Sequence, residues 1–172
     1  PLTRTFIEEA AGLLDAELKE SEAVQSALFP KGLDLLGWIQ KEAPTASYLA
    51  RSVISQPLIF VTQMAHFYNL IQYGADLKKL LQFTKGLTGH SQGIMPAVVV
   101  AASRDLNQFQ DLFHKTLRYF FWQGIRMQQS FPETDPAPEI NKASIDAGWG
   151  RPLVGRPLVG RPSPMASLAG LT

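Results

Sequence analysis

The chain has 172 residues, of which 45% are hydrophobic and 18% charged, and its formal net charge is +1. This size allows one sizeable core, and the near-neutral charge with scattered Lys and Arg argues against a nucleic-acid-binding surface. Cysteine is absent, which excludes disulfides and thiolate metal sites, and no apolar run is long enough to span a membrane.

The histidines and the two ends of the sequence add further expectations. His66, His90 and His114 are widely spaced and match no metal-ligand pattern, so we expect no metal site. The first residues show no signal-peptide pattern, so we expect a soluble, cytoplasmic protein. The sequence lacks an initiator methionine and ends as if within a strand or turn, so we expect an excerpt of a larger multidomain protein.

Hydrophobic periodicity predicts helices in the N-terminal half. Apolar residues recur at helical spacing over 3–28, which predicts a helix in one or two pieces. A shorter helix is predicted over 33–39. A strongly apolar helix is predicted over 58–73, because Pro57 fits a first helical turn and Gly74 fits the position just past a helix end.

The second half of the sequence combines one predicted strand with two predicted helices. Residues 83–88 predict a short strand, and 94–102 predict a helix with proline in its first turn. A long helix is predicted over 107–131. Its aromatic run at 119–122 is more typical of a buried core than of a ligand site.

Composition divides the chain into three parts. Residues 1–131 are expected to hold the helices and part of the core, 132–164 a Pro/Gly-rich loop, and 165–172 the start of the next core strand. The loop contains Arg-Pro-Leu-Val-Gly at 151–155 and again at 156–160, which we interpret as a duplication in an exposed segment. A parallel sheet needs several strands joined by crossovers, so we expect the rest of the sheet to come from sequence outside this chain.

The pentapeptide Gly89-His90-Ser91-Gln92-Gly93 lies between the predicted strand and the helix that follows it. A serine at a sharp strand-to-helix turn is the setting of a nucleophile elbow. We expect a side chain at Gly89 or Gly93 to collide with the neighbouring strand or helix. The Ser91 hydroxyl would sit at a helix N-terminus, where the Gln92 backbone N–H and the helix dipole stabilise an oxyanion. The alternative is an ordinary turn in which Ser91 caps the helix.

Two stretches, SQPLIFVTQMAH at 55–66 and KGLTGHSQG at 85–93, resemble the acyltransferase domains of type I fatty acid synthases. The acetyltransferase domain of the fungal-type β subunit is the most similar. The likeness covers most of the chain from about residue 29 onward and departs at the repeat. The resemblance implies an α/β fold, of which this chain is a helix-rich part. The implied fold is that of malonyl/acetyl-transferases, with an α/β-hydrolase-like core, a parallel sheet and a nucleophile elbow.

The resemblance also implies a reaction with two steps. Ser91 would take an acetyl group from acetyl-CoA and pass it to the phosphopantetheine thiol of an acyl carrier protein, as a starter unit for fatty acid biosynthesis. The implied partners are acyl-CoA, the carrier protein and other domains or subunits of the synthase, and no cofactor is bound permanently. A serine hydroxyl needs a base, and the family's histidine lies far downstream, so we expect it outside this chain.

Four further residues are implied to line the substrate pocket. His90 is expected to line it rather than act as the base, because adjacent side chains on an elbow point apart. Gln63 matches a glutamine of the family's pocket-side helix. Malonyl-using relatives carry an arginine at the position of Gln123, where a guanidinium binds the malonyl carboxylate. Glutamine there favours an uncharged starter, although Arg126, almost one turn further on, keeps a malonyl substrate open.

Three alternatives therefore stand beside the acetyl starter transferase. The first is a malonyl (extender) transferase that uses Arg126. The second is a serine esterase or thioesterase, which shares the elbow but uses water as the acceptor. The third is a non-catalytic scaffold portion of a megasynthase.

Overall fold

The computed structural model describes residues 2–21 and 25–130. This part of the chain consists of helices joined by turns and irregular segments, without a strand. None of the helices described is both long and apolar enough to cross a bilayer. The loop expected at 132–164 and the strand expected at 165–172 lie outside the described residues.

The elements in chain order are α1 (Leu2–Glu20), α2 (Gln25–Leu28), α3 (Leu35–Gln40), α4 (Ala46–Leu49), α5 (Ser52–Gln72), α6 (Leu77–Phe83), the 3-10 turn η2 (Ser91–Gly93), α7 (Ile94–Ala102) and α8 (Leu106–Ser130).

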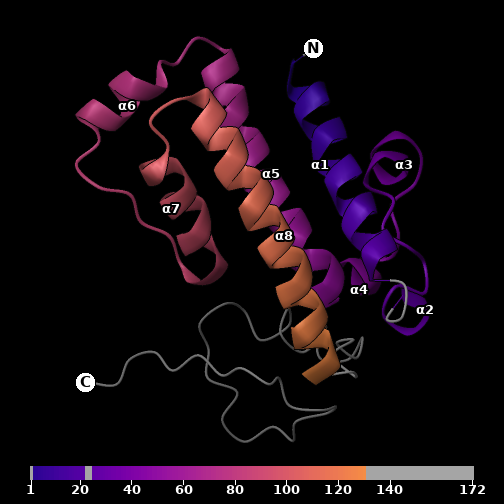
Figure 1. Cartoon of the computed structure of the whole chain (residues 1–172). Coiled ribbons are helices and arrows are strands. Elements are labelled where there is room, and N and C mark those ends of the chain that lie inside the picture. The colour runs from indigo at the N-terminus through magenta and orange to yellow at the C-terminus, as the bar shows by residue number, and fades with distance from the viewer. Residues whose placement is uncertain (1, 22–24, 131–172) are drawn as a thin grey trace, which may run out of the picture.

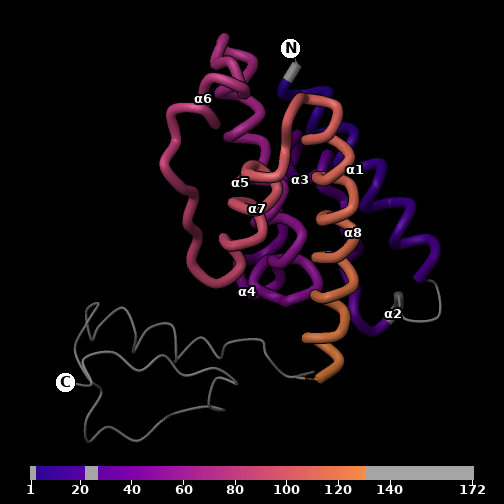
Figure 2. The backbone as a smooth tube through the Cα atoms, turned by 60° about the vertical axis from the view of Figure 1, so that its left-hand side comes forward, coloured from indigo at the N-terminus to yellow at the C-terminus, as the bar shows by residue number. Residues whose placement is uncertain are grey.

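The two longest helices, α5 and α8, lie side by side at the centre of the structure (Figure 1). Helix α1 packs against both of them on one side, and α7 packs against both on the other. Figure 2 shows α6 near the end of the bundle where α5 finishes. From α6 the chain runs along the outer side of α7 before it reaches η2 (Figure 1). The central pair therefore supports α7, and α5 also contacts η2, where the predicted elbow lies.

Helix α8 crosses the beginning of α5 with a very close backbone approach at Gly124. A Cβ atom at Gly124 would lie 2.6 Å from the Ser52 carbonyl oxygen, too close for any side chain. Four residues later, the fully buried Gln128 accepts a hydrogen bond from the Ser52 N–H at 2.9 Å through its Oε1 atom. The first N–H groups of a helix have no partner within it, and the N-cap residue Arg51 makes no side-chain cap bond. Helix α8 thus caps α5.

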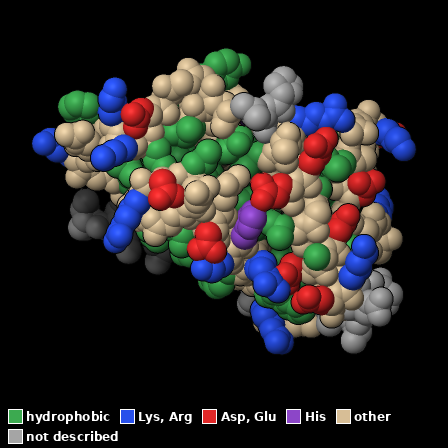
Figure 3. Space-filling view, turned by 45° about the horizontal axis from the view of Figure 1, so that its top comes forward, with side chains coloured by type: hydrophobic (Ala, Val, Ile, Leu, Met, Phe, Trp, Pro, Cys, Tyr) green, Lys and Arg blue, Asp and Glu red, His purple; other side chains and the backbone are tan. Residues whose placement is uncertain are grey.

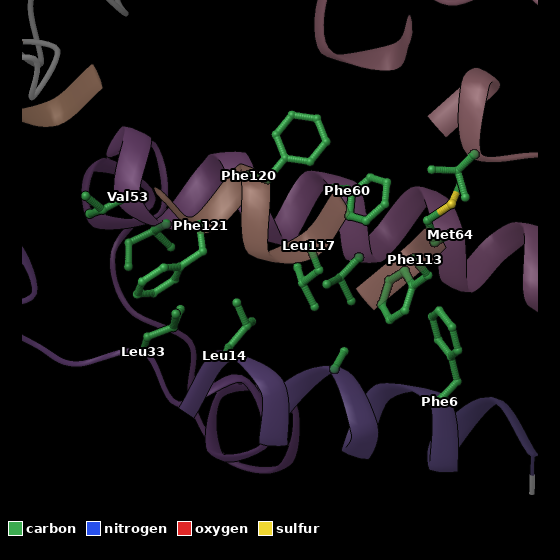
Figure 4. Close-up of a cluster of buried hydrophobic side chains, with 14 of the residues drawn as sticks. Phe6, Leu14, Leu33, Val53, Phe60, Met64, Phe113, Leu117, Phe120 and Phe121 are labelled. Carbon is green, nitrogen blue, oxygen red and sulfur yellow. The ribbon is translucent and has the colours of Figure 1, made fainter. Parts of the chain in front are cut away.

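The core between α1, α5 and α8 is largely aromatic. The ring of Phe113 lies 4.5 Å from that of Phe6 and 5.6 Å from that of Phe60, measured between ring centres. Phe120 extends the cluster at 5.0 Å from Phe60. Figure 4 shows Phe6 and Leu14 of α1 directed toward these rings. Each fully buried ring contributes about 1.5–3 kcal/mol relative to an exposed one, so this cluster dominates the stability of the described part.

Polar contacts fix how α1 sits on α8. Glu17 is only 4% exposed; it accepts a hydrogen bond from Trp122 Nε1 at 2.7 Å and pairs with Arg118. A buried carboxylate is costly unless it is paired and hydrogen-bonded, and here it is both. Nearer the start of α1, Glu9 Oε1 lies 2.7 Å from His114 Nε2.

Some large hydrophobic side chains remain exposed at the end of the bundle near α6. They include Leu70, Tyr73 and Phe83, of which the last two are 84% and 78% exposed. Figure 3, which brings the top of Figure 1 forward, shows hydrophobic side chains gathered near the middle of that face, with Lys and Arg side chains at its edges. The described residues alone therefore leave apolar surface uncovered.

Most of the predicted helices are confirmed. The helix over 3–28 occurs in two pieces, α1 and α2, and the shorter helix corresponds to α3. The helix at 94–102 is α7, and the long helix begins at Leu106, with the aromatic run at 119–122 contributing two fully buried rings to the core. Strong periodicity over many residues accounts for this agreement.

The strand predicted over 83–88 is wrong. Phe83 is the last residue of α6, whose start is fixed by a 3.1 Å hydrogen bond from the Lys79 N–H to Asp76 Oδ1. Residues 84–90 are irregular. A strand needs a neighbouring strand to bind its N–H and C=O groups, and the described part of the chain offers none.

The predicted start of the apolar helix is also wrong, whereas its predicted end is confirmed. Helix α5 begins at Ser52 rather than at Leu58, and Pro57 lies inside it. Pro57 has no N–H for the Val53 carbonyl, the usual cost of an interior proline. Local sequence did not indicate the start of α5, because the group that caps this helix is Gln128, far away in the sequence. At the other end, Gly74 follows with a φ of 97°.

We predict that Gly124→Ala destabilises the protein, because its Cβ would meet the Ser52 carbonyl. The loss expected is about 1–3 kcal/mol, as for other overpacked sites. Gly12→Ala is the matched control: it lies inside α1, where an added Cβ meets nothing within 4 Å, so it should stabilise the helix by up to about 1 kcal/mol. Urea unfolding followed by circular dichroism measures both changes. Equal effects of the two substitutions would show that the helix crossing tolerates a side chain.

Candidate active site

Ser91 has an unusual backbone conformation. Its φ is +53°, and it is the one non-glycine residue with positive φ in the described part of the chain. It opens η2, which passes directly into α7. Such a conformation costs about 1–2 kcal/mol for a residue with a Cβ atom and persists only where the surroundings hold it. The geometry is that of a sharp, strained turn that presents an exposed serine at the start of a helix.

Gly89 allows the chain to fold back on itself at this turn. A Cβ atom at Gly89 would overlap the backbone of Gly93, above all its carbonyl group. The prediction that a side chain cannot fit at Gly89 is therefore confirmed. The same prediction for Gly93 is wrong: a Cβ atom there would lie 3.8 Å from Gln63 Nε2, an ordinary contact.

The side chain of Gln92 ties the turn to α5. Its Nε2 atom donates a hydrogen bond to the Gln56 carbonyl oxygen at 2.5 Å. Gln56 lies one turn after the start of α5, immediately before Pro57 and six residues before Thr62. Sequence analysis missed this contact because the acceptor is a main-chain carbonyl, which no residue type reveals.

Gln63 lies beneath the other end of the turn. It is half-buried on α5, with its Nε2 atom near Gly93 as described above. Its Oε1 atom is buried and has no hydrogen-bond partner among the described residues. A buried acceptor without a donor calls for a partner such as water, a ligand or further chain. The structure thus places Gln63 close to the turn, and its role in a substrate pocket stays a prediction.

Gln123 and Arg126 occupy different environments on α8. Gln123 is half-buried, and its Oε1 atom is buried without a partner in the described part, whereas Arg126 is exposed. Trp122, which bonds to Glu17 of α1, is one helical step of about 100° away from Gln123. Gln123 therefore projects about 100° around α8 from Trp122, and Arg126, three residues on, projects about 60° from Gln123 and about 40° from Trp122.

The described residues supply no base for Ser91. The Ser91 hydroxyl forms no hydrogen bond within the described ranges, and His90 beside it is exposed. His66 is exposed on α5, and His114 binds Glu9 on the far side of the bundle. Within the same ranges, no group of three or more His, Asp or Glu side chains could hold a metal ion.

A shallow hollow of about 290 Å³ lies between the segment before the elbow and the outer face of α7. Its lining side chains are mostly apolar: Leu87, Thr88, Gly89, Ile94, Ala97, Val98 and Ala101. Ser91 does not line it. The hollow therefore marks an uncovered apolar face of α7 rather than a substrate pocket.

Comparison with known proteins identifies relatives of this chain. Residues 1–151 match the family described as starter unit:ACP transacylase in aflatoxin biosynthesis. The chain is 36% identical over 128 residues to the fatty acid synthase subunit beta of Schizosaccharomyces pombe, covering 74% of this chain and 6% of that protein. It is 31% identical over 160 residues to the Saccharomyces cerevisiae subunit, covering 91% and 7%. It is 31% identical over 171 residues to the fatty acid synthase beta subunit TOXC of Cochliobolus carbonum, covering 98% and 8%.

These matches confirm the resemblance to fungal fatty acid synthase β subunits that the motifs at 55–66 and 85–93 indicated. They span less than a tenth of each relative. The family model nevertheless covers most of this chain and includes the whole elbow. The chain belongs to the starter unit:ACP transacylase family.

Proposed function

We propose that this chain carries the nucleophile of a starter-unit acyltransferase of a fungal-type fatty acid synthase. The observation that carries the proposal is Ser91, exposed and strained at φ +53° at the start of a helix, in a chain of this family. An ordinary capping serine does not need a positive φ, because the N-cap position prefers extended backbone. The alternative of a simple capping turn is therefore disfavoured.

The proposed reaction transfers one acyl group through an ester of Ser91. A base removes the hydroxyl proton while the Ser91 oxygen attacks the thioester carbonyl of acetyl-CoA. The C–S bond then breaks, and the CoA sulfur leaves with the proton returned by the base. In the second step the phosphopantetheine thiol of the carrier protein loses its proton to the base and attacks the ester, and Ser91 leaves as a hydroxyl.

Main-chain groups of the turn would stabilise the negative charge that forms on the carbonyl oxygen. The backbone N–H of Gln92 lies at the start of η2 and α7, where N–H groups have no acceptor inside the helix. The positive end of the helix dipole adds to their effect. One such preorganised donor is typically worth about 100-fold to 1000-fold in rate. We assign Gln92 this oxyanion role through its main chain.

The remainder of the catalytic domain is proposed to lie in sequence of the complete synthase subunit. Helix α7 reads Ile-Met-Pro-Ala-Val-Val-Val-Ala-Ala and is apolar all round, yet Ile94 and Val98 are 53% and 51% exposed. A helix of this kind is normally buried on every side. A parallel sheet covering it would complete the α/β-hydrolase-like core and bring the histidine base and a second oxyanion donor.

The substrate proposed is an uncharged starter, acetyl-CoA, with an acyl carrier protein as acceptor. The enzyme would work in the cytoplasm beside the other synthase domains, without a permanently bound cofactor. His90, Gln63 and Gln123 would line the pocket. The buried, unpartnered Oε1 atoms of the two glutamines support this proposal, because a bound acyl-CoA has amide N–H groups to donate. A carboxylate beside Gln123 would lack a countercharge, which disfavours malonyl groups.

The alternatives receive less support. Arg126 is exposed, whereas Gln123 is half-buried with a buried, unpartnered Oε1 atom, so Gln123 is the better candidate for a pocket position. A hydrolase would share the elbow but fits poorly with membership of a transacylase family. A non-catalytic scaffold fits poorly with an intact, strained elbow.

We predict that Ser91→Ala abolishes covalent acyl loading in the complete polypeptide, because no oxygen nucleophile remains at the turn. Intact-mass spectrometry after brief incubation with acetyl-CoA, followed by peptide mapping, measures the adduct. Ser47→Ala, at an exposed serine on α4, should load normally. An acetyl adduct of undiminished yield on the Ser91→Ala protein would refute the mechanism.

We also predict that Gln123→Arg shifts substrate preference toward malonyl-CoA by about tenfold or more, since a charge-assisted pair is worth about 1.5–3 kcal/mol. The ratio of malonyl to acetyl adduct under competition measures this shift. Gln129→Arg adds the same charge at an exposed position of α8 and should leave the ratio unchanged. An unchanged ratio in Gln123→Arg would remove Gln123 from the pocket, and loss of malonyl loading in Arg126→Gln would favour the malonyl alternative.

A further inference from the structure

We propose that Gln92 is a positioning residue. By donating a hydrogen bond to the Gln56 carbonyl, its side chain fixes where the Ser91 hydroxyl and the oxyanion N–H lie relative to α5. This role differs from the main-chain role assigned to Gln92 above. It rests on the proposed function, because it concerns the same serine. Its chemistry is a single hydrogen bond from a carboxamide donor to a main-chain acceptor.

The first support is the strain at Ser91. A residue at φ +53° relaxes unless contacts on both sides of it prevent this. On one side, the close approach of Gly89 to the Gly93 backbone folds the turn tightly. That contact is internal to the turn and does not fix the turn against the rest of the molecule.

The second support is that Gln92 provides the external contact. Its Nε2 atom reaches the Gln56 carbonyl oxygen at 2.5 Å, across 36 positions of sequence. Neither His90 nor Ser91 makes a side-chain hydrogen bond to another element within the described ranges. Gln92 is therefore the one side chain of the pentapeptide seen to bond the turn to α5.

The third support is the nature of the acceptor. Gln56 belongs to α5, which is capped by Gln128 and held against α8 where Gly124 approaches Ser52. A carbonyl oxygen has two lone pairs, so it can accept from Gln92 in addition to a helical N–H. The bond thus connects the strained turn, at the residue next to Ser91 in the sequence, to a helix whose first turn is held by α8.

The consequence is a defined effect on rate. A displacement of about 1 Å in a reacting group can lower a rate by about 100-fold. Removing the donor should therefore slow acylation of Ser91 without altering the surface that binds the acyl-CoA. A merely structural role would instead lower the stability or the yield of folded protein and leave the rate per folded molecule unchanged.

The test uses the complete polypeptide with Gln92→Leu and Gln92→Glu. Leucine removes the donor, and glutamate keeps the shape but replaces the donor with an acceptor. Gln129→Leu is the matched control on the exposed side of α8. Rapid-quench mass spectrometry with acetyl-CoA gives the maximal rate of Ser91 acylation and the half-saturating concentration, and thermal unfolding gives the stability of each variant.

We expect both variants to lower the maximal rate by about 10-fold to 100-fold, with the half-saturating concentration changed by less than about twofold and the control unaffected. The rate of Gln92→Glu relative to the unmodified protein should rise as pH falls, because a protonated carboxyl group can donate to the Gln56 carbonyl. Gln92→Leu should show no such rise.

Three results would overturn the proposal: full acylation rates in both variants, a change confined to the half-saturating concentration, or a Gln92→Glu protein as fast as the unmodified one at neutral pH. The unmodified protein separates this proposal from the proposed function. If it acylates Ser91 and the variants do so equally well, only the positioning role fails. If it does not acylate Ser91 at all, both proposals fail.

Discussion

The crossing of α5 and α8 is the constraint on which the rest of the structure depends. Gly124 brings the two backbones together at Ser52, and Gln128 satisfies the N–H group that opens α5. A side chain at Gly124 would force the two backbones apart at the residue whose N–H Gln128 binds. Because α1 and α7 pack on opposite sides of the pair, the spacing set at the crossing determines where both of them lie.

The same helix pair supports the strained turn. The elbow gains no stability from Ser91, whose positive φ costs free energy. It is held to α5 by the bond from Gln92 to the Gln56 carbonyl. The strained, exposed serine thus lies on a bundle whose aromatic core offsets the local cost of the turn.

Several groups among the described residues lack a covering neighbour or a hydrogen-bond partner. Helix α7 exposes apolar side chains on its outer face, and the segment before Ser91 has extended residues such as His90 without a pairing strand. Buried oxygens of Gln63 and Gln123 lack donors within the described ranges. All of these groups favour covering by further structure or by ligand, which agrees with the small share of each relative that this chain spans.

The sequence by itself determined the long helices, the tight turn between Gly89 and α7, and the family. Periodicity and the spacing of Gly89, Ser91 and Gly93 are local properties that a chain carries whatever surrounds it. Gly89 was correctly singled out because the chain reversal is itself local. The start of α5, the missing strand and the Gln92 bond were decided only by tertiary structure. In each case the partner of a main-chain group lies far away in the sequence or is absent from the described residues, and local sequence carries no information about a distant hydrogen-bond partner.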